Sequence, residues 1–143
     1  MPVIESKTIH VVLIVSKDSE MSSVWDALFR QKNCAVITES SPRAALQTAR
    51  LFAPSLIILD VDLPHPERLV LCSKLRVTTR GALLLLLPRG QEQAAFDYYN
   101  AGVDECLPKH ISPLALLVKP IAWLRRLQWL ESGNEPQSLQ FSS

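Results

Sequence analysis

Residues 56–64 read Leu-Ile-Ile-Leu-Asp-Val-Asp-Leu-Pro, and the prediction of the fold starts from them. Four aliphatic residues, two of them β-branched, end abruptly in the carboxylate of Asp60 and in a turn at Pro64. Such a short apolar run is typical of a strand buried on both faces, as strands are in a parallel sheet. Ligands bind just outside the carboxyl ends of these strands, so Asp60 is the leading candidate for a functional residue. An isolated aspartate at such a place also caps helices or closes turns, and this alternative stays open.

The remaining sequence alternates short apolar runs with amphipathic stretches of helical period. The pattern predicts further strands at residues 9–15, 35–38, 82–87 and 105–107. It predicts helices at about residues 19–31, 42–52, 69–76, 94–101 and 113–127, with a loop at 65–67. Strands that alternate with helices predict an α/β fold with a doubly wound, five-stranded parallel sheet, because each crossover must be right-handed and cover one face.

The last predicted helix contains Pro120, which lacks the N–H of an interior helical residue. A proline at such a position costs about 3 kcal/mol, so we expect a bend between Leu117 and Ile121 or a helix that restarts at Pro120. The composition changes after this helix to Ser, Gln, Asn, Gly and Pro. We therefore assign residues 1–130 to one domain and residues 131–143 to a polar linker or tail.

Composition places the chain among ordinary globular domains. Of its 143 residues, 48% are hydrophobic and 20% are charged, and the formal net charge is +1. This balance gives no overall field for nucleic acid or a membrane surface. The start lacks a basic signal region, and the longest apolar run, 82–88, is too short to span a bilayer, which predicts a cytoplasmic protein. Cys34, Cys72 and Cys106 are predicted to be buried apolar residues in a reducing compartment.

Two motifs follow predicted strands and carry a family resemblance. Asp60 is followed by V-D-L-P, and Lys109 comes shortly after A-G-V-D-E-C-L at residues 101–107. Together they resemble the receiver domain of two-component response regulators, whose patterns are similar to L-D-x-x-L-P and A-G-A-D-D-Y-L-x-K-P. The resemblance covers about residues 9–130 and implies a flavodoxin-like (βα)5 fold. It implies a signalling domain and not an enzyme.

The resemblance assigns roles to three residues. It implies that Asp60 accepts a phosphoryl group from a sensor histidine kinase and that Lys109 reaches this carboxylate from the fifth strand. It also implies that the backbone carbonyl of Asp62 coordinates Mg²⁺. The chemistry is consistent, because a carboxylate that attacks phosphorus needs a nearby cation to offset the developing charge.

The sequence departs from the family pattern at the metal site. The two acidic residues expected after the first strand fall on Ser16 and Lys17. Mg²⁺ prefers carboxylates and other oxygen ligands, so a lysine there is a poor ligand and adds repulsion. Asp18 restores one ligand if the strand register slips, which gives Asp18, Asp60 and Asp62 as the candidate metal set. Lys17 either pairs with Asp60 in place of the metal or points to solvent.

The positions that sense the phosphoryl group in receivers also differ. The hydroxyl residue expected after the fourth strand is Leu87, followed by Pro88, and the aromatic residue of the fifth strand is Cys106. The proline expected after Lys109 is His110. The chain is therefore identified as a degenerate receiver with impaired Mg²⁺-dependent phosphorylation of Asp60. Three alternatives stay open: a working phospho-acceptor with a rearranged metal site, a phosphorylation-independent interaction module, and a small enzyme or cofactor binder on the same scaffold.

The resemblance also implies partners. Receivers dimerise through the fourth helix, fifth strand and fifth helix, and a similar charged face is predicted here from five residues: Asp104, Glu105, Lys119, Arg125 and Arg126. The same charges also suit an ordinary solvated surface. Residues 138–143 resemble the start of a winged-helix effector domain, or form a plain polar tail. No recognition helix or basic stripe is present, so DNA is expected to be contacted only through an effector domain outside this chain, with no membrane contact.

Overall fold

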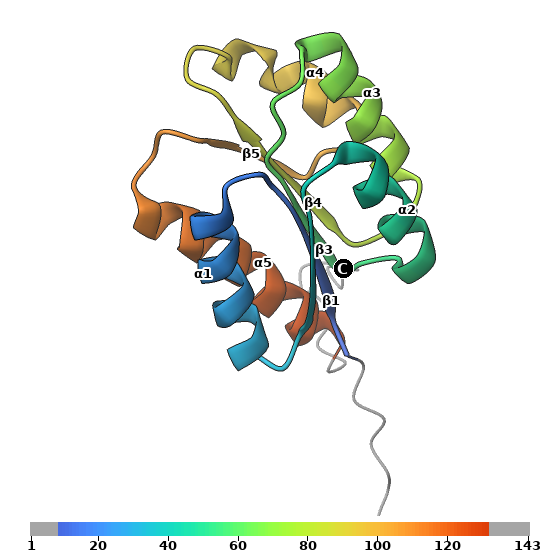
Figure 1. Cartoon of the computed structure of the whole chain (residues 1–143), viewed down its shortest axis with the longest axis vertical. Helices are drawn as coiled ribbons and strands as arrows, with labels where there is room; N and C mark the ends of the chain where they lie inside the picture. Colours follow the sequence, from blue (N-terminus) through green and yellow to red (C-terminus); the bar gives the residue numbers. More distant parts are fainter. Residues whose placement is uncertain (1–8, 132–143) are drawn as a thin grey trace, which may run out of the picture.

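The structure is a computed structural model and describes residues 9–131. One parallel sheet lies at its centre, with helices on both faces (Figure 1). Its strand order is β2-β1-β3-β4-β5, and every neighbouring pair is parallel. The strands are β1 Val11–Val15, β2 Ala35–Glu39, β3 Leu56–Leu59, β4 Ala82–Leu87 and β5 Glu105–Pro108. The predicted doubly wound sheet is confirmed.

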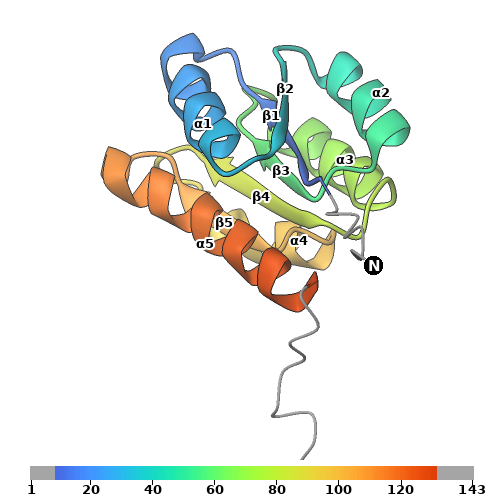
Figure 2. The same cartoon turned by 90° about the horizontal axis from the view of Figure 1, so that it is seen from below.

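Five α-helices cover the two faces of this sheet. They are α1 Ser19–Gln31, α2 Pro42–Phe52, α3 His65–Arg76, α4 Ala95–Asn100 and α5 Pro113–Glu131, and a 3-10 turn, η1 Glu92–Ala94, precedes α4. Helices α1 and α5 lie on one face, whereas α2, α3 and α4 lie on the other (Figures 1 and 2). Each face has its own core, centred on Trp25, Phe29 and Leu124 on one side and on Leu75 and Tyr98 on the other.

The central strands are apolar because both of their faces are covered. All residues of β3 and β4 are buried. Leucine favours helices as well as strands, but Gly81 and Pro88 leave room only for a strand in this run. A side chain at Gly81 would collide with the backbone oxygens of Pro54 and Ser55, so only glycine allows β4 to start this close to the segment before β3.

Helix α3 differs from its prediction. It begins at His65, not near Leu69, so the predicted loop at 65–67 is wrong. Pro66 suggested a loop, but it stands in the first turn of the helix, where a missing N–H is tolerated. The boundaries of the other elements differ from the predictions by a few residues. Such differences are usual at the ends of helices and strands.

Helix α5 is continuous through Pro120, so the predicted restart is wrong (Figure 2). Pro120 cannot donate to the carbonyl oxygen of Leu116, four residues earlier. The indole Nε1 of Trp25 in α1 donates to that oxygen instead, at 3.1 Å in the core. A side chain from the neighbouring helix thus satisfies the carbonyl group that the proline leaves without a partner.

The predicted linker begins inside this helix. Glu131 is the last residue of α5, so the expected boundary after residue 130 falls within it. Residues 132–143, including the stretch that resembles an effector-domain start, lie outside the described residues. Within residues 9–131, we find no helix with the length and hydropathy needed to span a membrane.

Candidate functional site

The site lies at the carboxyl edge of the sheet, where β1, β3 and β5 end. The backbone N–H of Asp60 donates to Val15 O at 2.8 Å, which fixes the residue directly after β3. The backbone N–H of Lys109 donates to Leu87 O at 2.7 Å after β5. The Lys109 ammonium then lies 2.9 Å from Asp60 Oδ1, and the aspartate side chain is only 7% exposed. The two motifs that are distant in sequence therefore meet in one ion pair.

Ser16 occupies the other oxygen of this carboxylate. Its hydroxyl donates to Asp60 Oδ2 at 2.8 Å and accepts from the backbone N–H of Asp18 at 3.0 Å. A buried carboxylate is costly unless its oxygens have donors, and Ser16 and Lys109 together supply one donor to each oxygen. The serine that replaces an expected acidic residue is thus part of the site.

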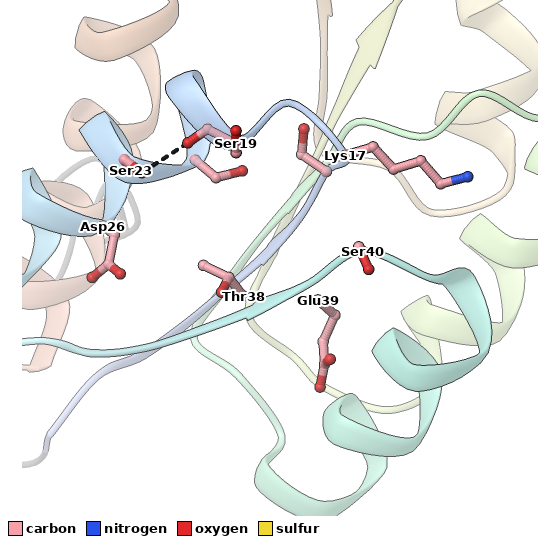
Figure 3. Close-up of a pocket in the computed structure, with 9 residues that line it drawn as sticks. Lys17, Ser19, Ser23, Asp26, Thr38, Glu39 and Ser40 are labelled. Atoms are coloured by element: carbon pink, nitrogen blue, oxygen red, sulfur yellow. Dashed lines mark hydrogen bonds between the residues drawn. The ribbon is translucent and has the colours of Figure 1, made fainter.

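Lys17 does not pair with Asp60, so that hypothesis is wrong and the solvent alternative holds. Lys109 makes the ion pair, and Lys17 is exposed and forms no ion pair with a carboxylate of residues 9–131. In Figure 3 its side chain extends away from Asp26 and Thr38. Lys17 still lines a pocket of about 100 Å³ together with Asp18, Asp60, Asp62 and Lys109, among others.

The three candidate metal ligands line that pocket but do not form a site that fits Mg²⁺. Asp18 is the N-cap of α1, and its Oδ1 accepts from the N–H of Met21 at 3.1 Å. Both oxygens of Asp60 already have donors, and Lys17 is among the residues that line the pocket. Nowhere in residues 9–131 do three or more His, Cys, Asp or Glu side chains gather as a metal site would need.

A second hollow, of about 520 Å³, lies beside Ser16 between α1 and the end of β2 (Figure 3). Hydroxyl groups dominate its lining, which also holds two carboxylates and Lys17: Ser16, Lys17, Ser19, Ser22, Ser23, Asp26, Thr38, Glu39 and Ser40. The sequence analysis missed it, because its serines come from separate segments and follow no motif. Asp26 is paired with Arg30, and Glu39 accepts from Thr48 at 2.5 Å.

The two positions that sense the phosphoryl group in receivers lack the expected chemistry. Leu87 ends β4 with 2% exposure and packs in the core. Cys106 is half-buried, and its backbone N–H donates to the hydroxyl of Tyr99 at 3.0 Å. Burial raises the pKa of the Cys106 thiol to about 11, so it stays neutral at physiological pH.

The five predicted interface residues separate into two groups. Glu105 Oε2 lies 3.2 Å from the Lys119 ammonium, and its Oε1 accepts from Trp123 Nε1 at 2.7 Å. The Arg126 guanidinium stacks 5.2 Å from the Trp123 ring centre, so these residues form one shallow groove on β5 and α5. The sequence analysis missed Trp123, although its spacing from Lys119 and Arg126 places all three on one side of a helix.

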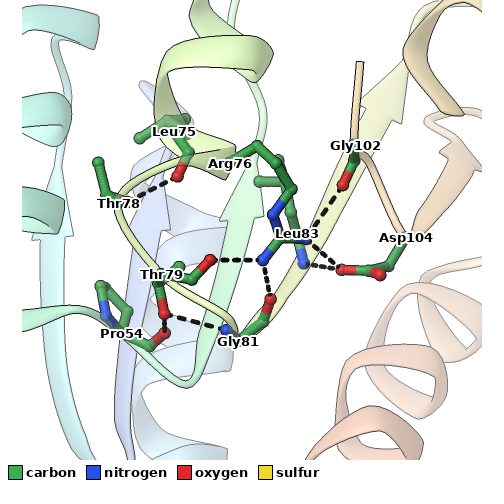
Figure 4. Close-up of polar contacts among 9 residues, drawn as sticks. All are labelled: Pro54, Leu75, Arg76, Thr78, Thr79, Gly81, Leu83, Gly102 and Asp104. Atoms are coloured by element: carbon green, nitrogen blue, oxygen red, sulfur yellow. Dashed lines mark hydrogen bonds and ion pairs between the residues drawn. The ribbon is translucent and has the colours of Figure 1, made fainter. Parts of the chain in front are cut away.

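Asp104 and Arg125 lie apart from this groove. Asp104 pairs with Arg76 at 2.9 Å and accepts from Leu83 N at 2.7 Å, at the amino edge of the sheet (Figure 4). Arg125 is exposed on α5. Asp104 is therefore committed to contacts within the fold.

A five-stranded parallel sheet with a buried aspartate and a lysine at its carboxyl edge defines a protein of the receiver type. The family model for the response regulator receiver domain matches residues 12–120, and the chain belongs to that family. Receiver domains of response regulators are signalling domains.

Relatives of the chain include transcriptional regulators. Transcriptional activator protein PfeR of Pseudomonas aeruginosa is 30% identical over 117 residues, which cover 82% of this chain and 38% of that protein. Protein PetR of Rhodobacter capsulatus is 33% identical over 119 residues, which cover 81% of this chain and 49% of that protein. The chain thus spans less than half the length of these two relatives.

Solved structures support the same fold. A CheY-like response regulator receiver domain protein from Methanospirillum hungatei JF-1 matches with a TM-score of 0.70 and 21% identity. The match covers 87% of this chain and 99% of that one. At this identity the likeness concerns the fold alone.

Proposed function

We propose that the chain is an atypical receiver that regulates an output, transcription, through dimerisation or protein contacts, with impaired Mg²⁺-dependent phosphorylation of Asp60. The observation that carries the proposal is the state of Asp60. Its two oxygens bind Ser16 and Lys109, at 2.8 and 2.9 Å. Ser16 and Lys17, which follow β1, bring a hydroxyl and an ammonium where a metal ion would need carboxylates.

A phosphoryl group brings negative charge to a buried carboxylate, and a bound divalent ion is usually the largest charge that offsets it. In this pocket, Lys17 repels a divalent cation, and Asp18 is already engaged as a helix cap. Lys109 remains as the cation that contacts Asp60. One ammonium without a metal ion offsets only part of the negative charge that develops when Asp60 attacks phosphorus, so the attack should be slow.

A gain of function tests this proposal. Replacing Ser16→Asp together with Lys17→Asp supplies the two missing carboxylates and removes the repelling ammonium. Incubation with acetyl phosphate, followed by mass spectrometry, should show Mg²⁺-dependent modification of Asp60 in the double variant and little in the native chain. Adding Asp60→Asn should abolish it. Ser40→Asp is the matched control, because Ser40 lines the same pocket but does not contact Asp60.

The opposite result has a clear meaning. Efficient Mg²⁺-dependent modification of native Asp60 would make the chain a working phospho-acceptor in which Asp18 and Asp62 rebuild the metal site. That alternative has one supporting observation, which is that both carboxylates line the pocket of Asp60.

The proposed dimer uses α4, β5 and α5. Support comes from the shallow groove of Glu105, Lys119, Trp123 and Arg126 and from the apolar surface of α4, where Phe96 is 72% exposed. Exposed ion pairs contribute little, about 0 to 1 kcal/mol, so the aromatic and apolar groups must supply most of the affinity. We further propose a sensor histidine kinase as partner, a cytoplasmic location, and DNA contact only through an effector domain outside this chain.

Sedimentation of charge variants tests the dimer. Arg126→Glu removes the stacking on Trp123 and reverses the charge of the groove, so we expect weaker dimerisation. Arg43→Glu is the control and should leave dimerisation unchanged, because Arg43 is exposed on α2, which packs beside β1 and β2, whereas β5 is the opposite edge strand of the sheet. Equal dimer affinity in both variants would place the interface elsewhere.

A further inference from the structure

A polar cluster that the sequence analysis missed joins α3 to α4. Arg68 in α3 is only 2% exposed, yet it forms no ion pair with a carboxylate of residues 9–131. Its Nη2 donates to Leu63 O at 2.7 Å, in the loop that follows Asp60. Its Nη1 donates to Gln91 Oε1 at 2.7 Å and to the hydroxyl of Tyr98 at 3.2 Å. The guanidinium thus binds two loops of the carboxyl edge and α4.

The chain of contacts continues from Tyr98 to the surface. Tyr98 is fully buried, and its hydroxyl oxygen lies 2.9 Å from Nδ1 of His65. The two rings also pack edge to face, with their centres 5.2 Å apart. On the other side of the imidazole, Nε2 lies 3.4 Å from Asp97 Oδ2. We call Arg68, Tyr98, His65 and Asp97 the α3–α4 relay.

The direction of the hydrogen bonds in the relay follows from what each group can do. Arg68 can only donate, so the Tyr98 oxygen accepts from it. Burial raises the pKa of Tyr98, although Arg68 lowers it, so the hydroxyl keeps its proton and must donate it. Within the described chain, the acceptor in contact is His65 Nδ1. In this arrangement Nδ1 of the imidazole accepts, which places the ring proton on Nε2, the nitrogen that faces Asp97.

We propose that His65 is a proton sensor that controls how tightly α4 is held against α3. A second proton on the imidazole must go to Nδ1, which then becomes a donor. Two cationic donors, from Arg68 and His65, would converge on one phenolic oxygen. The O–H of Tyr98 would lose its acceptor at a fully buried position. Protonation therefore breaks the relay at its centre.

The other groups around the relay do not reverse this outcome. Asp97 of α4 favours the imidazolium, but the side chains of His65 and Asp97 are 39% and 55% exposed, and exposed pairs are weak. An unsatisfied buried donor costs more than such a pair returns. The thiols of Cys72 in α3 and Cys106 in β5 also act on Tyr98, but their pKa values, raised by burial to about 12 and about 11, keep them neutral.

Loss of the relay would affect a surface that partners can reach. Helix α4 has only six residues, so its stability depends on packing and not on its own length. It presents Phe96 and Tyr99, which are 72% and 45% exposed. The sensor thus lies between the loop after Asp60 and the face of α4, in a receiver whose usual switch positions hold Leu87 and Cys106.

Nuclear magnetic resonance of the imidazole nitrogens tests the proton pattern on the native chain. At about pH 8, His65 should be the tautomer with its proton on Nε2 and with Nδ1 unprotonated. After correction for intrinsic rates, amide protection in α4 should fall by at least about fivefold when His65 becomes protonated, since an unsatisfied buried donor destabilises this contact.

Variants separate the sensor from general effects of acid. Tyr98→Phe keeps the buried ring but removes the hydroxyl, so protection in α4 should no longer respond to protonation of His65. His110→Gln is the control, because His110 lies 3.9 Å from Glu92 in the same region but outside the relay, and the response should remain. A proton on Nδ1 at about pH 8, or an unchanged response in Tyr98→Phe, would overturn the proposal.

Discussion

Helix α3 carries two arginines two turns apart, and they have opposite surroundings at the two edges of the sheet. Arg76, at the amino edge, donates to Gly102 O at 3.0 Å and to Thr79 O at 2.7 Å, and also to Gly81 O (Figure 4). Its charge is balanced by Asp104 at 2.9 Å. Arg68, at the carboxyl edge, is more deeply buried and has neutral acceptors only.

The different surroundings of Arg76 and Arg68 indicate that the amino edge of the sheet stabilises the fold, whereas the carboxyl edge serves function. At the amino edge, Asp104 pairs with Arg76 and accepts from the backbone N–H of Leu83 in β4, so each charged group has partners from several segments. At the carboxyl edge, the Nε of Arg68 is buried without a hydrogen-bond partner in the described part of the chain. A buried charge without a counter-ion lowers stability, so its presence points to a role other than stabilising the fold. The comparison therefore predicts large stability effects at Arg76 and small ones at Arg68.

The largest effect is expected for Arg76→Met. The change removes four donated hydrogen bonds, three to partly buried backbone carbonyl oxygens and one to the carboxylate of Asp104. Leaving these carbonyl oxygens without their donor should lower the free energy of unfolding by about 3 kcal/mol, to which the exposed pair with Asp104 adds little. Urea unfolding measures it. Arg80→Met, at an exposed position close in sequence, should change stability by less than about 0.5 kcal/mol, and an equal loss there would refute the special role of Arg76.

Cys72 lies between the two arginines on α3. The pKa of its thiol tests whether burial or the charge of Arg68 dominates at this position. Burial raises the pKa of its thiol to about 12, and Cys106 adds to this, although Arg68 acts in the opposite direction. An unfolded thiol titrates near pH 8.5, roughly, so the unfolded state loses its proton first as pH rises. The thiol thus contributes stability that is complete below the unfolded pKa and is lost as pH rises toward the folded value.

Cys72→Ala should therefore flatten the decline of stability at alkaline pH. Between about pH 9 and 11, the slope of unfolding free energy should become less negative by about 1.4 kcal/mol per pH unit, which is the effect of one proton. Urea unfolding at several pH values measures the slope. If the slope is unchanged, Cys72 titrates at its ordinary pKa, and the charge of Arg68 then offsets the effect of burial.

A smaller effect on stability is expected in the layer formed by α1 and α5. Trp25→Phe removes the donor to Leu116 O, which Pro120 leaves without its usual partner. The expected loss is about 1 to 2 kcal/mol, because a buried carbonyl group becomes unsatisfied. In a Pro120→Ala background, residue 120 regains an N–H for that oxygen, so the loss from Trp25→Phe should shrink. Equal losses in both backgrounds, measured as a double-mutant cycle, would show that the indole acts through packing alone.

The sequence predicts the local elements of the fold well because their signals are local. The apolar run that ends in Asp60 marks β3, and Ser41-Pro42 marks the start of α2, where the hydroxyl of Ser41 caps the helix. The resemblance implies that Lys109 reaches Asp60, and the topology explains how, since parallel strands bring their carboxyl ends to one edge.

The misses have a common physical cause, which is tertiary contact. Pro120 alone predicts a helix that bends or restarts. Trp25, which is distant in sequence, donates to the carbonyl oxygen of Leu116 that Pro120 leaves free. Lys17 is next to Ser16 in sequence, but Lys109 reaches Asp60 instead. Arg68 carries no motif at all, and only the packing of α3 against α4 places it beside Tyr98. Single-residue propensity contains none of this information.

The smallest effect, and the sharpest test of the comparison, is expected for Arg68→Met. Methionine fills similar apolar space and removes the desolvated charge, which offsets the loss of three donated hydrogen bonds. Stability should therefore change by less than about 1 kcal/mol in urea unfolding, against about 3 kcal/mol for Arg76→Met. A loss as large as that of Arg76→Met would mean that Arg68 is as structural as its neighbour. Near-equal stability, combined with faster amide exchange in α4, would instead show that a buried cation is retained to hold α4 in place and not to stabilise the fold.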